Sequence, residues 1–502
     1  MHLPLIPLPH ILARGHENFR LSNGTHLQGA PELIEAMLRE RTGLALDGSG
    51  TRCIEFGLGA DGPPESYQLE VGASRVRVAA ADPAGLFYAG CTLEQLLTRD
   101  GDGWVLPATT IRDAPRFGYR GAMLDVARHF FDVATVKRFI DRIARLKLNV
   151  LHLHLTDDHG WRIEIASWPE LTARASGSEA GGGPGGYYTQ ADYAELVAHA
   201  AARHVTIVPE IDLPGHTHAV GLAYLDLVEP PVLNEQTLAM LDDGVIPVAG
   251  QAFTGLGVGF SSLRIDHEPT YDFLADVFAE LAELTPGPYL HVGGDECLGT
   301  PPEAYATFLR RVTAIVTALG RTPIAWHEAG AVGGLSAGVV GQYWGYLTPE
   351  RAAAACARQL VAAGSRLILS PSDAAYLDML HDANDPLGQD WANGPTSLER
   401  SYCWEPSELI AGVGEPDILG VEAALWTEFV GTSAQIDAMV FPRLAAIAEV
   451  AWSAPSGAPG RSWPAFRDRI AALAPLWRSQ GIGFTQVAEV DWPEEDAGVI
   501  QS

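Results

Sequence analysis

Two consecutive carboxylic acids, Asp295 and Glu296, follow a short apolar stretch and two glycines in the segment His291-Val-Gly-Gly-Asp-Glu296. The glycines let the backbone turn tightly and pass close to a ligand. Neighbouring side chains on an extended backbone diverge, so we expect the two carboxyl groups to address different atoms of one substrate. A lone Asp-Glu pair is most often solvated surface, but a buried strand followed by a Gly-Gly turn favours acid–base chemistry.

The elements that must position this pair begin near Gly121, where short apolar stretches alternate with segments of helical period. Such alternation predicts parallel strands joined by crossover helices. The clearest helix follows Asp132, because Val136, Phe139 and Ile143 recur on one face and Asp132 is a good N-cap. Eight such units predict a TIM (β/α)8 barrel. The predicted strands are Gly121–Val126, Asn149–Leu155, Thr206–Ile211, Tyr289–Val292, Pro323–Trp326, Val339–Tyr343, Arg366–Leu369 and Leu419–Ala424.

The residues that follow these strands are polar or aromatic, and the active site of a TIM barrel lies at that end of the strands. Indole rings stack on the C–H face of a sugar, while carboxylates and arginine hydrogen-bond its hydroxyls. The pattern therefore predicts a sugar pocket. The residues concerned are Arg128, Asp157, Asp158, Asp212, His216, Asp295, Glu296, Trp326, Glu328, Trp344, Tyr376, Asp378, Trp426 and Glu428.

The first part of the chain has a different pattern, which predicts a small non-catalytic α+β domain. We place this domain at residues 1–113 and the barrel domain at residues 114–502, since the 502 residues exceed what one core usually holds. The small domain should contain helices at Pro31–Arg41 and Ala84–Leu97 and strands at Tyr67–Val71 and Ser74–Ala79.

The charge of the chain restricts its partners. With 33 Lys and Arg against 62 Asp and Glu, a formal charge of −29 disfavours nucleic acid and anionic lipid and is compatible with a neutral sugar. No apolar run approaches the roughly 18 residues of a membrane span, and the start is a poor signal peptide. Five cysteines without a Cys-x-x-Cys motif indicate free thiols, so we expect a cytoplasmic protein of unspecified oligomeric state.

Four motifs in order carry a resemblance to a known family. They are Leu124-Asp-Val-Ala-Arg-His-Phe-Phe131, His152-Leu-His-Leu-Thr-Asp-Asp158, Val208-Pro-Glu-Ile-Asp-Leu-Pro-Gly-His216 and His291-Val-Gly-Gly-Asp-Glu296. Together they resemble the family 20 glycoside hydrolases, specifically the bacterial β-N-acetylhexosaminidases, over about residues 115 to 455. The N-terminal unit also resembles the non-catalytic domain that precedes the barrel in that family.

The resemblance implies a retaining exo-β-N-acetylhexosaminidase that releases terminal N-acetylglucosamine or N-acetylgalactosamine from β-glycosides without a cofactor. The 2-acetamido oxygen of the substrate then replaces an enzyme carboxylate as nucleophile. Glu296 is implied as general acid and later base. Asp295 is implied to accept the acetamido N–H, and Tyr376 to donate its hydroxyl to the acetamido oxygen.

The remaining implied roles concern substrate binding and support of the acid. The spacing of Asp212 and His216 suggests an Asp–His relay behind Glu296, and Asp157 matches a position that pairs with charged residues of the site. The resemblance further implies an acetamido cage of Trp326, Trp344 and Trp426, hydroxyl ligands Arg128, Asp378 and Glu428, and Trp391 as a stacking surface for the next sugar.

Two other functions remain open. His152 and His154, with His216 and His218, raise the possibility of a zinc amidohydrolase. The pair precedes the end of its strand, however, so we expect buried, hydrogen-bonded histidines and no metal. A non-catalytic sugar-binding protein is the other alternative, although retention of Asp295, Glu296 and Tyr376 speaks against it. The long segment Ala223–Phe260 is expected to lie over the mouth and shape the leaving-group side.

Overall fold

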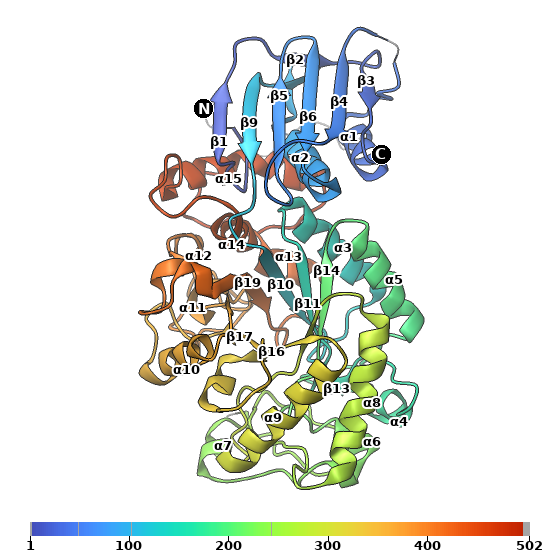
Figure 1. Ribbon diagram of the computed structural model, residues 1–502, viewed down its shortest axis with the longest axis vertical. Helices are drawn as coiled ribbons and strands as arrows, with labels where there is room; N and C mark the ends of the chain where they lie inside the picture. The colour runs from blue at the N-terminus through green and yellow to red at the C-terminus, as the bar shows by residue number, and fades with distance from the viewer. Residues whose placement is uncertain (1–2, 49, 102, 242, 495–502) are drawn as a thin grey trace. The chain divides into compact units, whose positions relative to one another are not determined.

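The computed structural model describes residues 3–494 apart from residues 49, 102 and 242 (Figure 1). Contacts between residues divide the chain into two compact units. One unit consists of residues up to Arg116, the short segment Arg145–Lys147 and the residues from Phe441 onward. The other consists of Phe117–Ala144 and Leu148–Val440.

The second unit is a closed barrel of eight strands in sequence order, in which every neighbouring pair is parallel. Each strand overlaps one of the eight that the sequence predicts, which confirms the (β/α)8 barrel. The strands are β10 (Tyr119–Asp125), β11 (Val150–His154), β14 (Thr206–Glu210), β15 (Tyr289–His291), β16 (Thr322–Trp326), β17 (Val340–Tyr343), β18 (Leu367–Leu369) and β19 (Ile418–Leu425).

The barrel interior changes character along the strands. At one level it is apolar, with a buried cluster that includes Tyr119, Val150, Val208 and Ile324. Because strand side chains alternate between two faces, the next inward-facing level lies two residues further along. There the side chains are polar, and all are buried: His152, Glu210, His291, Gln342 and Glu422. The polar level faces the C-terminal ends of the strands, where the site is expected.

The helices of this unit follow the strands as the pattern predicts. The first, α3, spans Val133–Arg145, and the carboxylate of Asp132 accepts the N–H of Thr135 at 2.8 Å, as expected of an N-cap. The other elements are α4 (Glu170–Ala175), α5 (Gln190–Ala201), α6 (Val220–Ala223), α7 (Glu235–Ala239), α8 (Glu268–Leu284), α9 (Pro302–Ala318), α10 (Arg351–Ala362), α11 (Ser372–Ala375), α12 (Leu398–Tyr402), α13 (Ser433–Val440), the short 3-10 turns η1 (Leu225–Leu227), η2 (His327–Ala331), η3 (Pro406–Glu408) and η4 (Glu415–Asp417), and the hairpin β12 (Thr156–Asp157) and β13 (Gly160–Trp161).

The first unit is a small α+β domain, as the sequence predicts. Its six-stranded sheet has the order β1-β9-β5-β6-β4-β3, and a second sheet has the order β2-β8-β7. The elements are β1 (Ile11–Arg14), β2 (Phe19–Leu21), β3 (His26–Gln28), α1 (Glu32–Thr42), β4 (Cys53–Leu58), β5 (Tyr67–Val71), β6 (Arg75–Ala80), α2 (Pro83–Leu96), β7 (Thr98–Asp100), β8 (Gly103–Leu106), β9 (Thr109–Asp113), α14 (Arg443–Trp452) and α15 (Trp463–Ser479).

The last two helices belong by contacts to this unit, whereas the sequence analysis assigns them to the barrel domain. Buried charges explain the grouping. Arg469 on α15 binds Glu449 on α14 through two contacts of 2.6 Å and donates to the carbonyl of Leu5 at 2.7 Å. Glu449 also accepts the N–H of Leu8 at 3.0 Å. Burying this pair requires all of these partners together.

The helices considered for membrane insertion are those of residues 3–494, without residues 49, 102 and 242. None of them has both the length and the apolar character that crossing a bilayer requires.

Candidate active site

A cavity of about 490 Å³ opens at the C-terminal ends of the barrel strands. Most of the predicted site residues line it, so the barrel brings together side chains that are up to 300 positions apart. Three apolar residues of the long segment Ala223–Phe260 also line it, as expected of a segment over the mouth. The lining residues are Arg128, Met240, Leu256, Val258, Asp295, Glu296, Trp344, Tyr346, Tyr376, Asp378, Gln389, Trp391, Trp426, Glu428 and Phe429.

The carboxyl pair lies on a turn that only glycine can form. Gly293 and Gly294 have φ angles of 69° and 107°, in the left-handed region that other residues rarely adopt. A Cβ on Gly293 would lie 1.7 Å from an oxygen of Asp212. The turn leaves Asp295 only 7% exposed, while the side chain of Glu296 is 29% exposed. The two carboxyl groups therefore face different surroundings. The backbone at the pair is not extended as the sequence analysis expects, because Glu296 has a φ of 46°.

The titration of the two groups differs as well. Burial raises the pKa of Glu296 to about 7, and the charge of Asp295 adds to the rise while His216 opposes it. Burial raises the pKa of Asp295 to about 6, where Glu328 adds to the rise and His216 again opposes it. Both carboxyl groups can thus exchange a proton near neutrality, and the more exposed Glu296 is the one that a leaving group and water can reach.

One side-chain oxygen of Asp295 can accept a hydrogen bond from a bound molecule. Its Oδ1 atom is buried, and within the described part of the chain no group hydrogen-bonds to it. Buried carboxylate oxygens without a partner are costly, so native sites usually leave them for a ligand or water. An N–H group of a bound molecule would satisfy this atom.

His216 links the acid to a buried carboxylate. Its Nε2 atom lies 3.6 Å from Glu296 Oε2, and its Nδ1 atom lies 3.3 Å from Asp157 Oδ2. Burial favours the neutral ring, but the charges of Asp157 and Asp212 hold the pKa of His216 well above its ordinary value. The site therefore places an imidazolium directly behind Glu296.

The partner of His216 differs from the expected one. The spacing in the sequence predicts Asp212 as the partner of His216, whereas the shortest contacts of the imidazole in the structure are with Asp157, and Asp212 acts on the ring only through its charge. Asp212 instead accepts the backbone N–H of Gly294 at 3.2 Å and so supports the glycine turn. Proximity in sequence is misleading here, because the chain turns sharply between Asp212 and His216, which has a positive φ of 53°.

Aromatic rings wall the cavity on one side. The ring centroids of Trp344 and Tyr376 lie 6.2 and 5.9 Å from that of Trp391, which is 44% exposed at the mouth. Burial keeps the pKa of Tyr376 well above its ordinary value, so its hydroxyl remains a donor. Trp344 is held by its indole N–H, which donates to both oxygens of Glu328 at 3.1 Å.

Trp326 lies behind the wall that it is predicted to form. It is fully buried, does not line the cavity, and its ring centroid lies 6.0 Å from that of Trp426. Trp326 thus packs against Trp426 on the side away from the cavity. Its indole N–H donates to Glu210 Oε1 at 3.0 Å, which fixes its position.

A second group of lining residues is charged or polar. The guanidinium of Arg128 lies 4.8 Å from the ring centroid of Trp426 and pairs with Asp157 at 2.9 Å. Glu428 lies 3.9 Å from Arg128 Nε and accepts from Gln389 at 3.2 Å. With Asp378, these groups form a polar end that suits a sugar bearing several hydroxyls.

Sequence reasoning missed several residues of the cavity. Gln389, Tyr346 and Phe429 lie within two positions of the predicted Trp391, Trp344 and Glu428, respectively. That adjacency was the available signal. Met240, Leu256 and Val258 gave no comparable signal, because the direction in which they point depends on how the segment Ala223–Phe260 folds.

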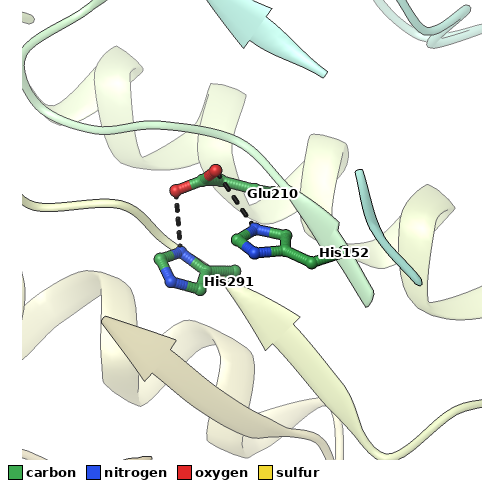
Figure 2. A group of neighbouring side chains, drawn as sticks. All are labelled: His152, Glu210 and His291. Atoms are coloured by element: carbon green, nitrogen blue, oxygen red, sulfur yellow. Dashed lines mark ion pairs between the residues drawn. The ribbon is translucent and has the colours of Figure 1, made fainter. Parts of the chain in front are cut away.

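The histidines of β11 lie buried beside other side chains that could bind a metal ion. His152, Glu210 and His291 are close enough to share an ion. The Glu210 carboxylate lies 3.1 Å from His152 Nε2 and 2.9 Å from His291 Nδ1, and Figure 2 shows one of its oxygens directed toward each ring. His152 and His154 also bind carboxylates through their other nitrogens, at 2.9 Å from Glu422 and Asp157. These contacts fit buried ion-paired histidines.

Comparisons with known proteins agree with this geometry. Residues 117–302 and 298–455 match the model of the glycosyl hydrolase family 20 catalytic domain, and residues 2–114 match domain 2 of that family. A β-N-acetylhexosaminidase of Cellulomonas fimi is 42% identical over 89% of this chain and 86% of its own length.

Two solved structures are also similar to this chain over almost its full length. A family 20 β-N-acetylglucosaminidase superposes with a TM-score of 0.91 and 51% identity, covering 97% of this chain and 99% of that one. A mutant Streptomyces plicatus β-hexosaminidase in complex with its product GlcNAc superposes with a TM-score of 0.88 and 42% identity, covering 98% of both chains.

Proposed function

The chain belongs to glycosyl hydrolase family 20, as a glycoside hydrolase of the β-N-acetylhexosaminidase type, and we propose that it is a retaining exo-enzyme with substrate-assisted catalysis. It releases terminal N-acetylglucosamine or N-acetylgalactosamine from short β-glycosides. The carboxyl pair carries the proposal: Glu296 has a pKa of about 7, and the adjacent Asp295 has a buried oxygen without a donor.

In the first step, the 2-acetamido oxygen of the bound sugar attacks C1 as the bond from C1 to the leaving oxygen breaks. Glu296 donates its proton to that leaving oxygen. Asp295 accepts the acetamido N–H, and its charge stabilises the oxazolinium that forms. Tyr376 and Trp344 hold the acetamido group near C1, which makes the nucleophile intramolecular.

In the second step, Glu296 acts as a carboxylate and takes a proton from water as the water oxygen attacks C1. The bond between C1 and the acetamido oxygen breaks, and the product keeps the β configuration. The imidazolium of His216, 3.6 Å from Glu296, stabilises the carboxylate between the two steps.

Substrate selection follows from the two ends of the cavity. Arg128, Asp378 and Glu428 bind hydroxyls of the terminal sugar. A glycan therefore cannot extend beyond that sugar. Trp391, which is 44% exposed, stacks on the sugar that leaves. The GlcNAc bound in the Streptomyces plicatus structure supports N-acetylglucosamine as one substrate.

The stereochemistry tests this proposal directly. Hydrolysis of p-nitrophenyl N-acetyl-β-glucosaminide, followed by proton NMR in the first minutes, is expected to release the β-anomer. The matching β-glucoside, which has a 2-hydroxyl in place of the acetamido group, is expected to be inert because it lacks the nucleophile.

Two results would contradict the proposal: initial release of the α-anomer, or comparable turnover of the two glycosides. The assay includes EDTA, so that loss of activity on chelation would favour the zinc alternative. An inert protein that still binds N-acetylglucosamine would favour the sugar-binding alternative.

The dependence of kcat/KM on pH is expected to be bell-shaped. Asp295 must be charged to stabilise the oxazolinium, so activity rises as pH rises through its pKa of about 6. Glu296 must be protonated to serve the leaving group, so activity falls as pH rises through its pKa of about 7. Because the two groups interact, the measured limbs belong to the pair. A flat profile across both values would contradict these assignments.

A further inference from the structure

We propose that Glu210, in the polar level of the barrel interior, is a positioning residue. It holds both the side chains that lie behind the acid Glu296 and Trp326, which lies behind the aromatic wall. The inference rests on the proposed function, because it assigns Glu210 a role in that reaction. It concerns a buried carboxylate that lies outside the cavity and has no part in the steps above.

Each oxygen of Glu210 lies close to two side-chain nitrogen atoms. Oε1 accepts the indole N–H of Trp326 at 3.0 Å and lies 2.9 Å from His291 Nδ1. Oε2 lies 2.5 Å from His154 Nδ1 and 3.1 Å from His152 Nε2. Figure 2 shows the carboxylate bridging the rings of His152 and His291. Glu210 is fully buried, so these contacts rather than water compensate its charge.

A continuous line of side chains runs from Glu210 to the acid. His154 binds Glu210 through Nδ1, and its Nε2 atom lies 2.9 Å from Asp157 Oδ2. Asp157 lies 3.3 Å from His216, which lies 3.6 Å from Glu296. Carboxylates and imidazoles therefore alternate along the whole line.

The charge of Glu210 determines how His154 can bind. Burial favours the neutral ring, but Glu210 and Asp157 hold the pKa of His154 well above its ordinary value. A doubly protonated ring donates to both carboxylates at once, whereas a neutral ring donates to only one. The charged or titratable groups that surround His154 are Glu210, Asp157, Asp125, Arg128, Asp212 and Asp295.

The same barrel level contains a matched carboxylate that does not reach the site. Glu422 on β19 is also fully buried and accepts from Gln342 at 2.6 Å and from Tyr119 at 2.5 Å. It binds His152 at 2.9 Å, but none of its described contacts involves Trp326 or the line to His216. Glu422 thus controls for the loss of one buried negative charge from the barrel interior.

The test compares Glu210→Gln with Glu422→Gln in the full chain. Glutamine keeps the size of the side chain and removes the charge. We expect Glu210→Gln to lower kcat about tenfold to a hundredfold, the range that a small misplacement of catalytic groups produces, with little change in KM. Glu422→Gln is expected to change kcat less than about threefold, because it does not disturb the line of side chains from Glu210 to Glu296.

The loss in Glu210→Gln is further expected to grow as pH rises, because only Asp157 then remains hydrogen-bonded to His154 to hold its second proton against the effect of burial. Nitrogen-15 NMR of the histidine rings reads this change without reference to activity. His154 should remain doubly protonated at pH 8 in the wild type and should not in Glu210→Gln. If Glu210 had only a structural role, the loss of kcat would not depend on pH, and His154 would stay doubly protonated in the variant.

Three results would overturn the inference: equal losses in the two variants, a loss that does not depend on pH, or a His154 spectrum unchanged by Glu210→Gln. If Glu210→Gln does not fold, His154→Gln decides, and wild-type kcat in that variant would overturn the inference. An inactive wild-type protein would instead refute the proposed function, so the two failures are distinguishable.

Discussion

Replacing Glu296 with Gln is expected to lower kcat by about 10²- to 10⁴-fold on a disaccharide substrate, the usual contribution of a positioned general acid and base. Glutamine fills the same space but cannot give a proton to the leaving oxygen or take one from water. The raised pKa of about 7 makes this loss large, because the wild-type group is partly protonated at neutral pH. Steady-state kinetics on the β-linked dimer of N-acetylglucosamine measure it.

The leaving group provides the control for this variant. p-Nitrophenolate leaves with little help from an acid, so the loss on the aryl glycoside is expected to be smaller than the loss on the disaccharide. A misfolded variant would lose activity equally on both, and its thermal unfolding midpoint would fall. Equal losses with an unchanged midpoint would mean that Glu296 does not protonate the leaving group.

The barrel and the cavity were largely predictable because both depend on local patterns. Each barrel strand is a short apolar run, and the residue types change abruptly where the run ends. Asp295, Glu296 and Tyr376 could be placed in one site without knowing any distance, since all strands of a parallel barrel end at the same face. The order of the motifs along the chain was sufficient.

The contacts between strands were not predictable in this way. Asp157 and His216 lie 59 positions apart, and their contact depends on the register that places His154 beside Glu210 across β11 and β14. Asp212, four positions from His216, was the nearer candidate in sequence and forms a different contact. The sequence pattern indicates which face a side chain occupies but not its partner on that face.

Tertiary packing also decided the grouping of the last helices, and the facing of the apolar residues in the segment Ala223–Phe260. Arg469 and Glu449 look like ordinary surface charges in sequence, yet they form a buried pair. The cytoplasmic location expected from the cysteines and the start of the chain stays a prediction.

Replacing Asp295 with Asn is expected to lower kcat by about 10²- to 10³-fold, the range seen when a group that stabilises developing charge is removed. Asparagine can still accept a hydrogen bond from the acetamido N–H, but it carries no charge to balance the oxazolinium. KM should change much less, because the neutral bound substrate gains little from that charge. The acidic limb of the pH profile near pH 6 should also disappear, since the group that titrates there is gone.

The double variant separates a shared transition state from two independent effects. In the proposed first step, Asp295 acts on the nucleophile while Glu296 acts on the leaving group, and both contributions belong to one bond exchange at C1. Losses of residues that act as a unit are not additive, so the double variant should lose less than the product of the two single losses. A loss equal to that product would mean that the two carboxyl groups contribute independently and do not act as a unit in the first step.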